Sequence, residues 1–211
     1  LGTDKSMIKL CSAWGQGPDI RDTEWPDLVR TVVAAGGSGV NVMCGLKSKD
    51  TLRTIEDAKI AQDMGANSLQ IELPYNHKPN QDQYVKHFTM ISDAIDIGIM
   101  IYNTYWFGCD SLEPETLLRL KDAEHVAAIK WNYPDPDGYD KMKEIIDSGE
   151  LGALKALIIY ETSSLFNGAS HSFDLLQRLN SDVPVAWVQG HLPDGDRVIE
   201  GAGPRYCPSV E

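Results

Sequence analysis

Positive charge is scarce in this sequence of 211 residues, in which 19 lysines and arginines stand against 31 aspartates and glutamates. The net charge of −12 argues against nucleic acid or an anionic membrane as a partner, because both are bound through an excess of lysine and arginine. We therefore expect neither partner, and we interpret the acidity mainly as a contribution to solubility.

Metal-binding motifs and long apolar runs are also missing. The four cysteines are far apart and form no C-x-x-C pair, and the five histidines include no H-x-x-x-H motif. We therefore expect no metal. Neither a basic-plus-apolar N-terminal signal nor an apolar run long enough to span a bilayer is present. These features predict a soluble protein in a reducing compartment such as the cytoplasm.

What the sequence does contain is a regular period. The chain is 42% hydrophobic, and its β-rich runs alternate with amphipathic helical patterns that end on Gly or Asn in several places. A near-constant spacing of strand, helix and strand is typical of a parallel sheet with helical crossovers. The predicted strands begin near Met7, Gly39, Ser68, Gly98, Val126, Leu154 and Val183.

This pattern predicts an α/β fold, and its even spacing favours a closed (β/α)₈ barrel over an open, doubly wound sheet. The count of strands is one short of eight. Either the first β/α unit is missing from this chain, or an eighth strand lies in the Pro- and Gly-rich tail. We expect one barrel domain over residues 1–211.

A lysine stands inside one of the buried runs, in the stretch VAAIKWNY at residues 126–133. Burying an ammonium group is costly unless it is paired or loses its proton, and a lysine without its proton is a nucleophile. Lys130 is therefore a candidate catalytic residue. The alternative is a strand-end lysine whose stem is buried and whose charged head reaches water.

Tyr102 ends the preceding strand at a matching depth, and in such barrels reacting groups stand at the C-terminal ends of the strands. A phenol beside an amine suits imine chemistry, since its hydroxyl can move protons while the imine forms and a carbon–carbon bond breaks. The alternative is that Tyr102 only caps the barrel layer and hydrogen-bonds to a backbone group.

Four blocks in order resemble the dihydrodipicolinate synthase / N-acetylneuraminate lyase family of Schiff-base aldolases. They are the region from Gly45 to Phe88 with its PYNHKP loop, the IMIYNT strand, LEPETLLRL and VAAIK. The resemblance spans roughly residues 12–146, and residues 147–211 form a divergent C-terminal part. It implies a (β/α)₈ barrel that acts on pyruvate or a related 2-oxo acid, with Lys130 as the imine-forming lysine and Tyr102 as the proton relay.

Several positions depart from the family pattern. The family's G-T-T-G-E turn, whose threonines hold the substrate carboxylate, aligns with residues 12–16, where Ala13 and Trp14 stand instead. A second tyrosine of the family is Asn76 here, and an arginine that the synthase uses is Phe107. We therefore do not expect aspartate semialdehyde as the acceptor.

Bulky side chains near the strand ends, Trp131 among them, indicate an apolar or aromatic aldehyde as the acceptor. The predicted substrate-binding residues are Ala13, Trp14, Tyr75, Asn103, Tyr105 and Phe107.

The sequence thus predicts a lyase, an aldolase or a hydratase-aldolase, that joins Lys130 to a 2-oxo acid and needs no cofactor. We expect a homo-oligomer, because family members are usually dimers or tetramers. The alternative is a relative that has lost catalysis and serves as a binding or scaffold subunit.

Overall fold

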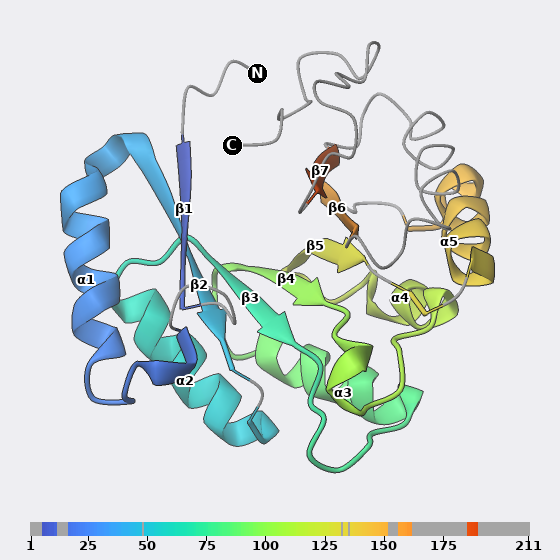
Figure 1. The fold of residues 1–211 in the computed structure, drawn as a ribbon, viewed down its shortest axis with the longest axis horizontal. Helices are drawn as coiled ribbons and strands as arrows, with labels where there is room; N and C mark the ends of the chain where they lie inside the picture. Colours follow the sequence, from blue (N-terminus) through green and yellow to red (C-terminus); the bar gives the residue numbers. More distant parts are fainter. Residues whose placement is uncertain are drawn as a thin grey trace.

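The computed structural model describes residues 6–11, 17–47, 49–131, 133–134, 136–151, 156–161 and 185–189. Its strands form one sheet in the order β1 to β7, and every neighbouring pair is parallel. Helices α1 to α5 follow one another along the outer side of this curved sheet (Figure 1). This is the arrangement of a (β/α) barrel, as the sequence predicts.

All seven predicted strands are confirmed within one to two residues. The strands are β1 (Ser6–Leu10), β2 (Val40–Leu46), β3 (Ser68–Glu72), β4 (Gly98–Tyr102), β5 (Val126–Trp131), β6 (Ala156–Glu161) and β7 (Val185–Gln189). The helices are α1 (Trp25–Gly36), α2 (Thr51–Asp63), α3 (Gln81–Ser92), α4 (Pro114–Leu120) and α5 (Pro136–Ser148). One of the helical patterns in the sequence, at residues 172–180, lies outside the described residues, as does the Pro- and Gly-rich tail that is the alternative place for an eighth strand.

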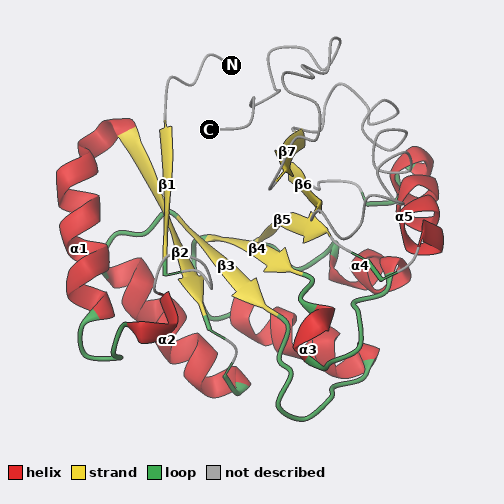
Figure 2. Ribbon diagram, viewed as in Figure 1, coloured by secondary structure: helices red, strands yellow, loops and turns green. Residues whose placement is uncertain are grey.

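Helices α2 and α3 begin where the sequence supplies a capping side chain. The Asp50 carboxylate accepts hydrogen bonds from the backbone N–H groups of Leu52 and Arg53, at the start of α2. Asn80 and Gln83 form a reciprocal capping box at the start of α3. These caps stabilise the starts of the two helices that follow the loops after β2 and β3 (Figure 2).

The two faces of the sheet differ in chemistry. On β3, Leu69 and Ile71 belong to a hydrophobic cluster shared with α2 and α3, so they face the helices. Because successive strand residues point to opposite faces, Gln70 and Glu72 face the concave side. Strand pairing places further side chains on that concave side: Met43 on β2, Met100 and Tyr102 on β4, and Ala128 and Lys130 on β5.

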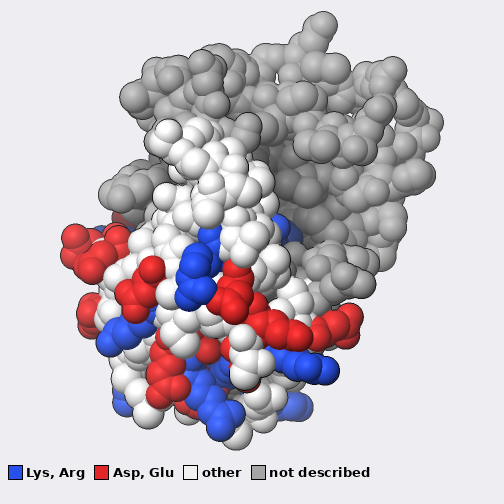
Figure 3. Space-filling view, turned by 90° about the vertical axis from the view of Figure 1, so that its left-hand side faces the viewer, with Lys and Arg blue, Asp and Glu red and all other residues white. Residues whose placement is uncertain are grey.

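The outer surface mixes charges of both signs. Figure 3 shows acidic and basic side chains interspersed over the lower portion of the described surface on the side that carries α1, whereas the upper portion is largely uncharged. Many of these charges are paired locally, as in the exposed contact between Arg30 and Asp27 on α1. Among the described residues, no helix is long and apolar enough to cross a membrane.

Candidate active site

Lys130 and Tyr102 meet on the concave side of the sheet. They are register partners on the neighbouring strands β5 and β4, and the Lys130 Nζ atom lies 3.8 Å from the centre of the Tyr102 ring. Both side chains are buried, with Lys130 only 8% exposed. The structure therefore brings the predicted nucleophile and the predicted relay residue into contact.

The environment of Lys130 disfavours its charged form. Burial, followed by the nearby Lys9 ammonium, lowers the pKa of Lys130 to about 7, while Glu72 acts in the opposite direction. At neutral pH a substantial fraction of such an amine carries no proton and can attack a carbonyl carbon. The sequence predicts this lowered pKa from burial, and the structure adds Lys9 as a second cause.

Glu72 is the third member of this row of side chains. It pairs with Tyr102 across β3 and β4, just as Tyr102 pairs with Lys130 across β4 and β5. Burial raises the pKa of Glu72, and the ammonium groups of Lys9 and Lys130 partly offset this effect. No described residue forms an ion pair with Glu72.

Lys9 is absent from the residues predicted above, although its local pattern resembles that of Lys130. It stands within the apolar run MIKLC on β1, and its Nζ atom lies 6.0 Å from the centre of the Tyr102 ring. The same ammonium donates a hydrogen bond to the side-chain oxygen of Gln70 on β3. A charged residue inside an apolar run is the signal that could have identified it.

Asn103 braces the loop after β4. Its side-chain nitrogen donates to Ser111 Oγ over 2.9 Å, and its side-chain oxygen accepts from the Leu112 N–H over 2.9 Å. The neighbouring Thr104 hydroxyl accepts a hydrogen bond from the Leu73 N–H, which ties this loop to the end of β3. These contacts give Asn103 a structural role, and its predicted contact with substrate stays a prediction.

Aromatic side chains gather over the ends of β3 and β4. The rings of Tyr75 and Phe107 lie 5.4 Å apart between their centres, at an interplanar angle of 42°. Phe107 is exposed, and Tyr105 precedes it in the short helix η3 (Tyr105–Phe107), where burial raises the pKa of its phenol. Three of the predicted substrate-binding residues therefore cluster beside the strand ends.

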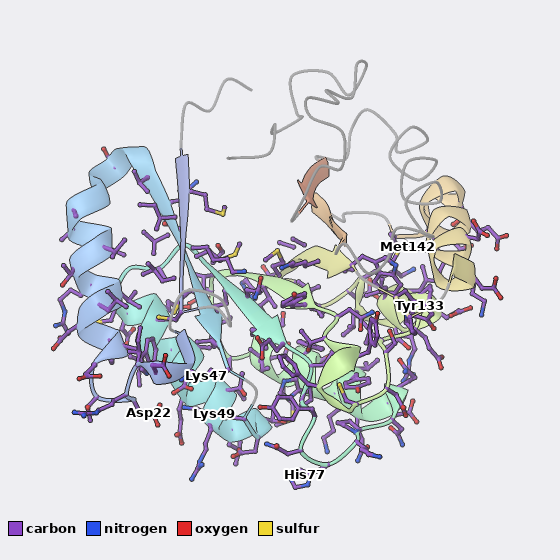
Figure 4. The ribbon with its side chains drawn as sticks, viewed as in Figure 1. Asp22, Lys47, Lys49, His77, Tyr133 and Met142 are labelled. Carbon is purple, nitrogen blue, oxygen red and sulfur yellow. The ribbon has the colours of Figure 1, made fainter. Side chains whose placement is uncertain are left out.

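Two other aromatic predictions have different outcomes. Trp131 is fully buried in the hydrophobic cluster, because the residue after Lys130 must point to the helical face. It packs on Tyr133, which Figure 4 places near α4 and α5, so its predicted part in acceptor binding is wrong. Ala13 and Trp14 lie outside the described residues.

A separate group of charges lies beyond the end of β2. Lys49 forms ion pairs with Asp57 at 2.7 Å and Asp22 at 3.4 Å, and Figure 4 shows Lys47 beside Lys49 and Asp22. Lys47 also acts on Glu72 through its positive charge. Within the described part of the chain, no group of three or more His, Cys, Asp or Glu side chains is placed to hold a metal ion.

Comparison with known proteins shows which protein family this chain belongs to. The model of the dihydrodipicolinate synthetase family matches residues 5–151, which include β1 to β5 and both Lys130 and Tyr102. The chain belongs to this family. The match begins before the resemblance seen in the sequence and ends close to the point where that resemblance fades.

The curated relatives described here are both named 4-hydroxy-tetrahydrodipicolinate synthase. The chain is 37% identical over 123 residues to the 4-hydroxy-tetrahydrodipicolinate synthase of Corynebacterium jeikeium, and covers 41% of that protein. It is 33% identical over 137 residues to the synthase of the same name from Thermomicrobium roseum, and covers 44% of it. These matches involve 58% and 64% of this chain. The chain therefore spans less than half the length of these relatives.

Solved structures agree on the fold. Dihydrodipicolinate synthase from Thermotoga maritima superimposes with a TM-score of 0.70 at 24% identity, over 82% of this chain and 56% of its own. The chloride-inhibited enzyme from Acinetobacter baumannii, in complex with pyruvate, gives 0.67 at 20% identity, over 83% of this chain and 56% of its own. The barrel fold of this family member is thus shared with these enzymes.

Proposed function

We propose that this family member is a class I lyase that joins Lys130 to pyruvate or a related 2-oxo acid through an imine. The observation that carries the proposal is the buried contact between Lys130 Nζ and the ring of Tyr102, 3.8 Å from its centre. The lowered pKa of Lys130 supports it, since only the neutral amine is nucleophilic. The names of the curated relatives support the same class of reaction.

The first half of the reaction forms the imine. The Lys130 lone pair attacks the carbonyl carbon, and the carbonyl oxygen takes up a proton to give a carbinolamine. Loss of water then leaves a protonated C=N bond. This cationic group can accept the electron pair of an adjacent C–H or C–C bond, which the original carbonyl would accept less readily.

Proton transfer in these steps is the proposed role of Tyr102. A phenol in contact with the reacting nitrogen can donate a proton to the departing oxygen and later return one to carbon. Glu72 stands next to Tyr102 on the same face, so the phenol has a carboxylate neighbour. No metal or organic cofactor is required by this scheme.

The acceptor is proposed to be an apolar or aromatic aldehyde. Tyr75 and Phe107 pack together over the ends of β3 and β4, where they offer ring surface to a second substrate. Tyr105 precedes Phe107 in the same short helix and can add to this surface. Charged acceptors such as aspartate semialdehyde would gain nothing from these rings.

The test is chemical trapping. The protein is incubated with pyruvate and borohydride, which reduces an imine to a stable secondary amine, and the intact mass is measured. One adduct per chain is expected in wild type and none in Lys130→Ala. An unmodified wild-type protein would overturn the proposal and favour a binding or scaffold subunit.

We also propose a homo-oligomer built from single barrel domains over residues 1–211, located in the cytoplasm. Met7 and Ile8 on β1 are 57% and 41% exposed, and β1 pairs with a described strand on one side only. Light scattering at micromolar concentration is expected to give a mass of at least two chains. A uniform monomer would contradict the oligomer.

A further inference from the structure

A second lysine shares the concave side with Lys130. Lys9 lies on β1, yet its ammonium donates to Gln70 on β3 and so reaches past β2. In a curved sheet, side chains two strands apart can meet only across the concave side. Gln70 is 1% exposed, so the Lys9 ammonium is held beside a buried amide although the Lys9 residue as a whole is exposed.

The charges on this side are unbalanced. The ammonium groups of Lys9 and Lys130 lie on the same aromatic ring, at 6.0 and 3.8 Å from its centre. Burial lowers the pKa of both lysines, and the Glu72 carboxylate acts in the opposite direction on each of them. Lys47 adds a further positive charge at the end of β2. In a protein of net charge −12, this concentration of lysine against one carboxylate among the described residues is suited to an anionic ligand.

We propose that the Lys9 ammonium, oriented by Gln70, binds the carboxylate of the 2-oxo acid while Lys130 attacks its carbonyl carbon. The inference rests on the proposed function and adds a specificity residue to it. In a 2-oxo acid the carboxylate is bonded directly to the carbonyl carbon, so it must lie close to Lys130. Lys9 is the next cation along the Tyr102 ring, and a hydrogen bond between two charged groups is stronger than a neutral one.

The arrangement leaves Lys9 able to bind. An ammonium has three N–H groups, and the contact with Gln70 uses one of them. Gln70 is neutral, so it fixes the direction of the ammonium without cancelling its charge. Lys9 also disfavours the protonated form of Lys130 until a carboxylate arrives to neutralise the pair.

The decisive variant is Lys9→Met, which keeps the apolar stem and removes the charge. The pyruvate concentration that half-saturates borohydride trapping is expected to rise by about 10- to 100-fold, the value of a charge-assisted hydrogen bond. Trapping of acetaldehyde, which has a carbonyl but no carboxylate, is expected to change less than about threefold. Lys9→Arg should recover part of the loss because it restores the charge.

Lys59→Met on α2 is the matched control, since Lys59 is exposed on a helix and outside the site. It should behave as wild type. Equal losses for pyruvate and acetaldehyde in Lys9→Met would show a merely structural role and overturn the inference. So would unchanged half-saturation by pyruvate.

A second measurement does not depend on imine formation by a 2-oxo acid. Formaldehyde and cyanoborohydride methylate accessible neutral amines, and lactate carries the carboxylate without a reactive carbonyl. Lactate is expected to slow the methylation of Lys130 in wild type, and the concentration needed should rise at least tenfold in Lys9→Met. Absence of protection, or equal protection in both proteins, would overturn the inference, whereas failure of pyruvate trapping would overturn only the proposed function.

Discussion

The helical face and the concave face of the sheet share the same strands but are built from different residues. Along β5, Ile129 and Trp131 enter the hydrophobic cluster under the helices, whereas Lys130 between them faces the concave side. β4 repeats the pattern, with Ile101 under the helices and Tyr102 on the concave side. The alternation of a strand thus lets a single hexapeptide serve both packing and chemistry.

The difference between the faces concerns free energy as well as position. The outer face gains stability from apolar burial, while the concave face holds lysines and a carboxylate whose burial costs free energy. Substitutions on the two faces should therefore have opposite effects on stability and on imine chemistry. Outer-face variants should lose stability and keep chemistry, and concave-face variants should lose chemistry and keep or gain stability.

Lys130→Met should have the largest effect on chemistry. It should abolish trapping of pyruvate and raise the free energy of unfolding by about 1–3 kcal/mol at pH 7, because a lysine with a lowered pKa destabilises the folded state. Between the unfolded pKa, about 10.4, and the folded pKa of about 7, only the unfolded chain takes up the proton. The gain should therefore grow as pH falls through this window and level off below it.

Urea unfolding of the wild-type and Lys130→Met proteins at several pH values measures this difference in the free energy of unfolding. Lys86→Met on α3 is the control, since Lys86 is exposed there. A destabilised Lys130→Met protein, or a stability difference that does not depend on pH, would show that Lys130 is charged and paired in the folded state.

Tyr102→Phe should come next. The ring and its contact with Lys130 remain, so trapping should persist, but turnover with a 2-oxo acid should fall by about 10²- to 10⁴-fold if the hydroxyl relays protons. Loss of an ordinary structural hydrogen bond would cost only about 0.5–1.5 kcal/mol of stability. Turnover within about threefold of wild type, together with a lower melting temperature, would contradict the assignment of Tyr102 as the proton relay.

Leu69→Ala tests the helical face. Leu69 is fully buried on β3, so the truncation should lower the free energy of unfolding by about 2–5 kcal/mol. Trapping per folded molecule should stay close to that of wild type, because the side chain points away from Lys130. Leu52→Ala, at a residue 64% exposed on α2, should cost less than about 0.5 kcal/mol. Loss of trapping in folded Leu69→Ala protein would contradict the claim that the helical face contributes stability and not chemistry.

Asn103→Ala should give the smallest effect. The variant loses two hydrogen bonds within a buried loop, so a stability loss of about 1–3 kcal/mol is expected. If the role of Asn103 is structural, half-saturation of trapping by pyruvate should change little. A large rise in that concentration without loss of stability would instead support the substrate contact that the sequence predicts.

The elements of this fold could be predicted because each strand carries its own signal. Seven apolar runs at an even spacing predict the parallel sheet, and the matching depth of Tyr102 and Lys130 at the ends of β4 and β5 predicts that the two side chains meet. For Lys9 the apolar run marks the residue itself, but it does not predict which side chains the residue contacts. Its contacts with Gln70 and Tyr102 depend on the curvature of the sheet, which brings β1 opposite β3 and β4, and no local pattern reports that curvature.

Side-chain direction explains the error at Trp131. Trp131 looks like an acceptor-binding aromatic in the sequence, but the alternation that turns Lys130 inward turns Trp131 outward into the core. Asn103 follows the active strand, yet its amide is used by the loop that it braces. Trp131 is near the site in sequence, but its direction separates it from the site, whereas the contact of Asn103 with substrate stays a prediction.

The most direct test of the division between the faces is to locate the adduct itself. Wild-type protein is treated with pyruvate and borohydride, digested, and mapped by mass spectrometry, with particular attention to the peptides that contain Lys130 and Lys9. We expect modification at Lys130, little or none at Lys9, and no adduct in Lys130→Met. An adduct of equal yield on Lys9 or on an outer lysine, or one that persists in Lys130→Met, would contradict this expectation.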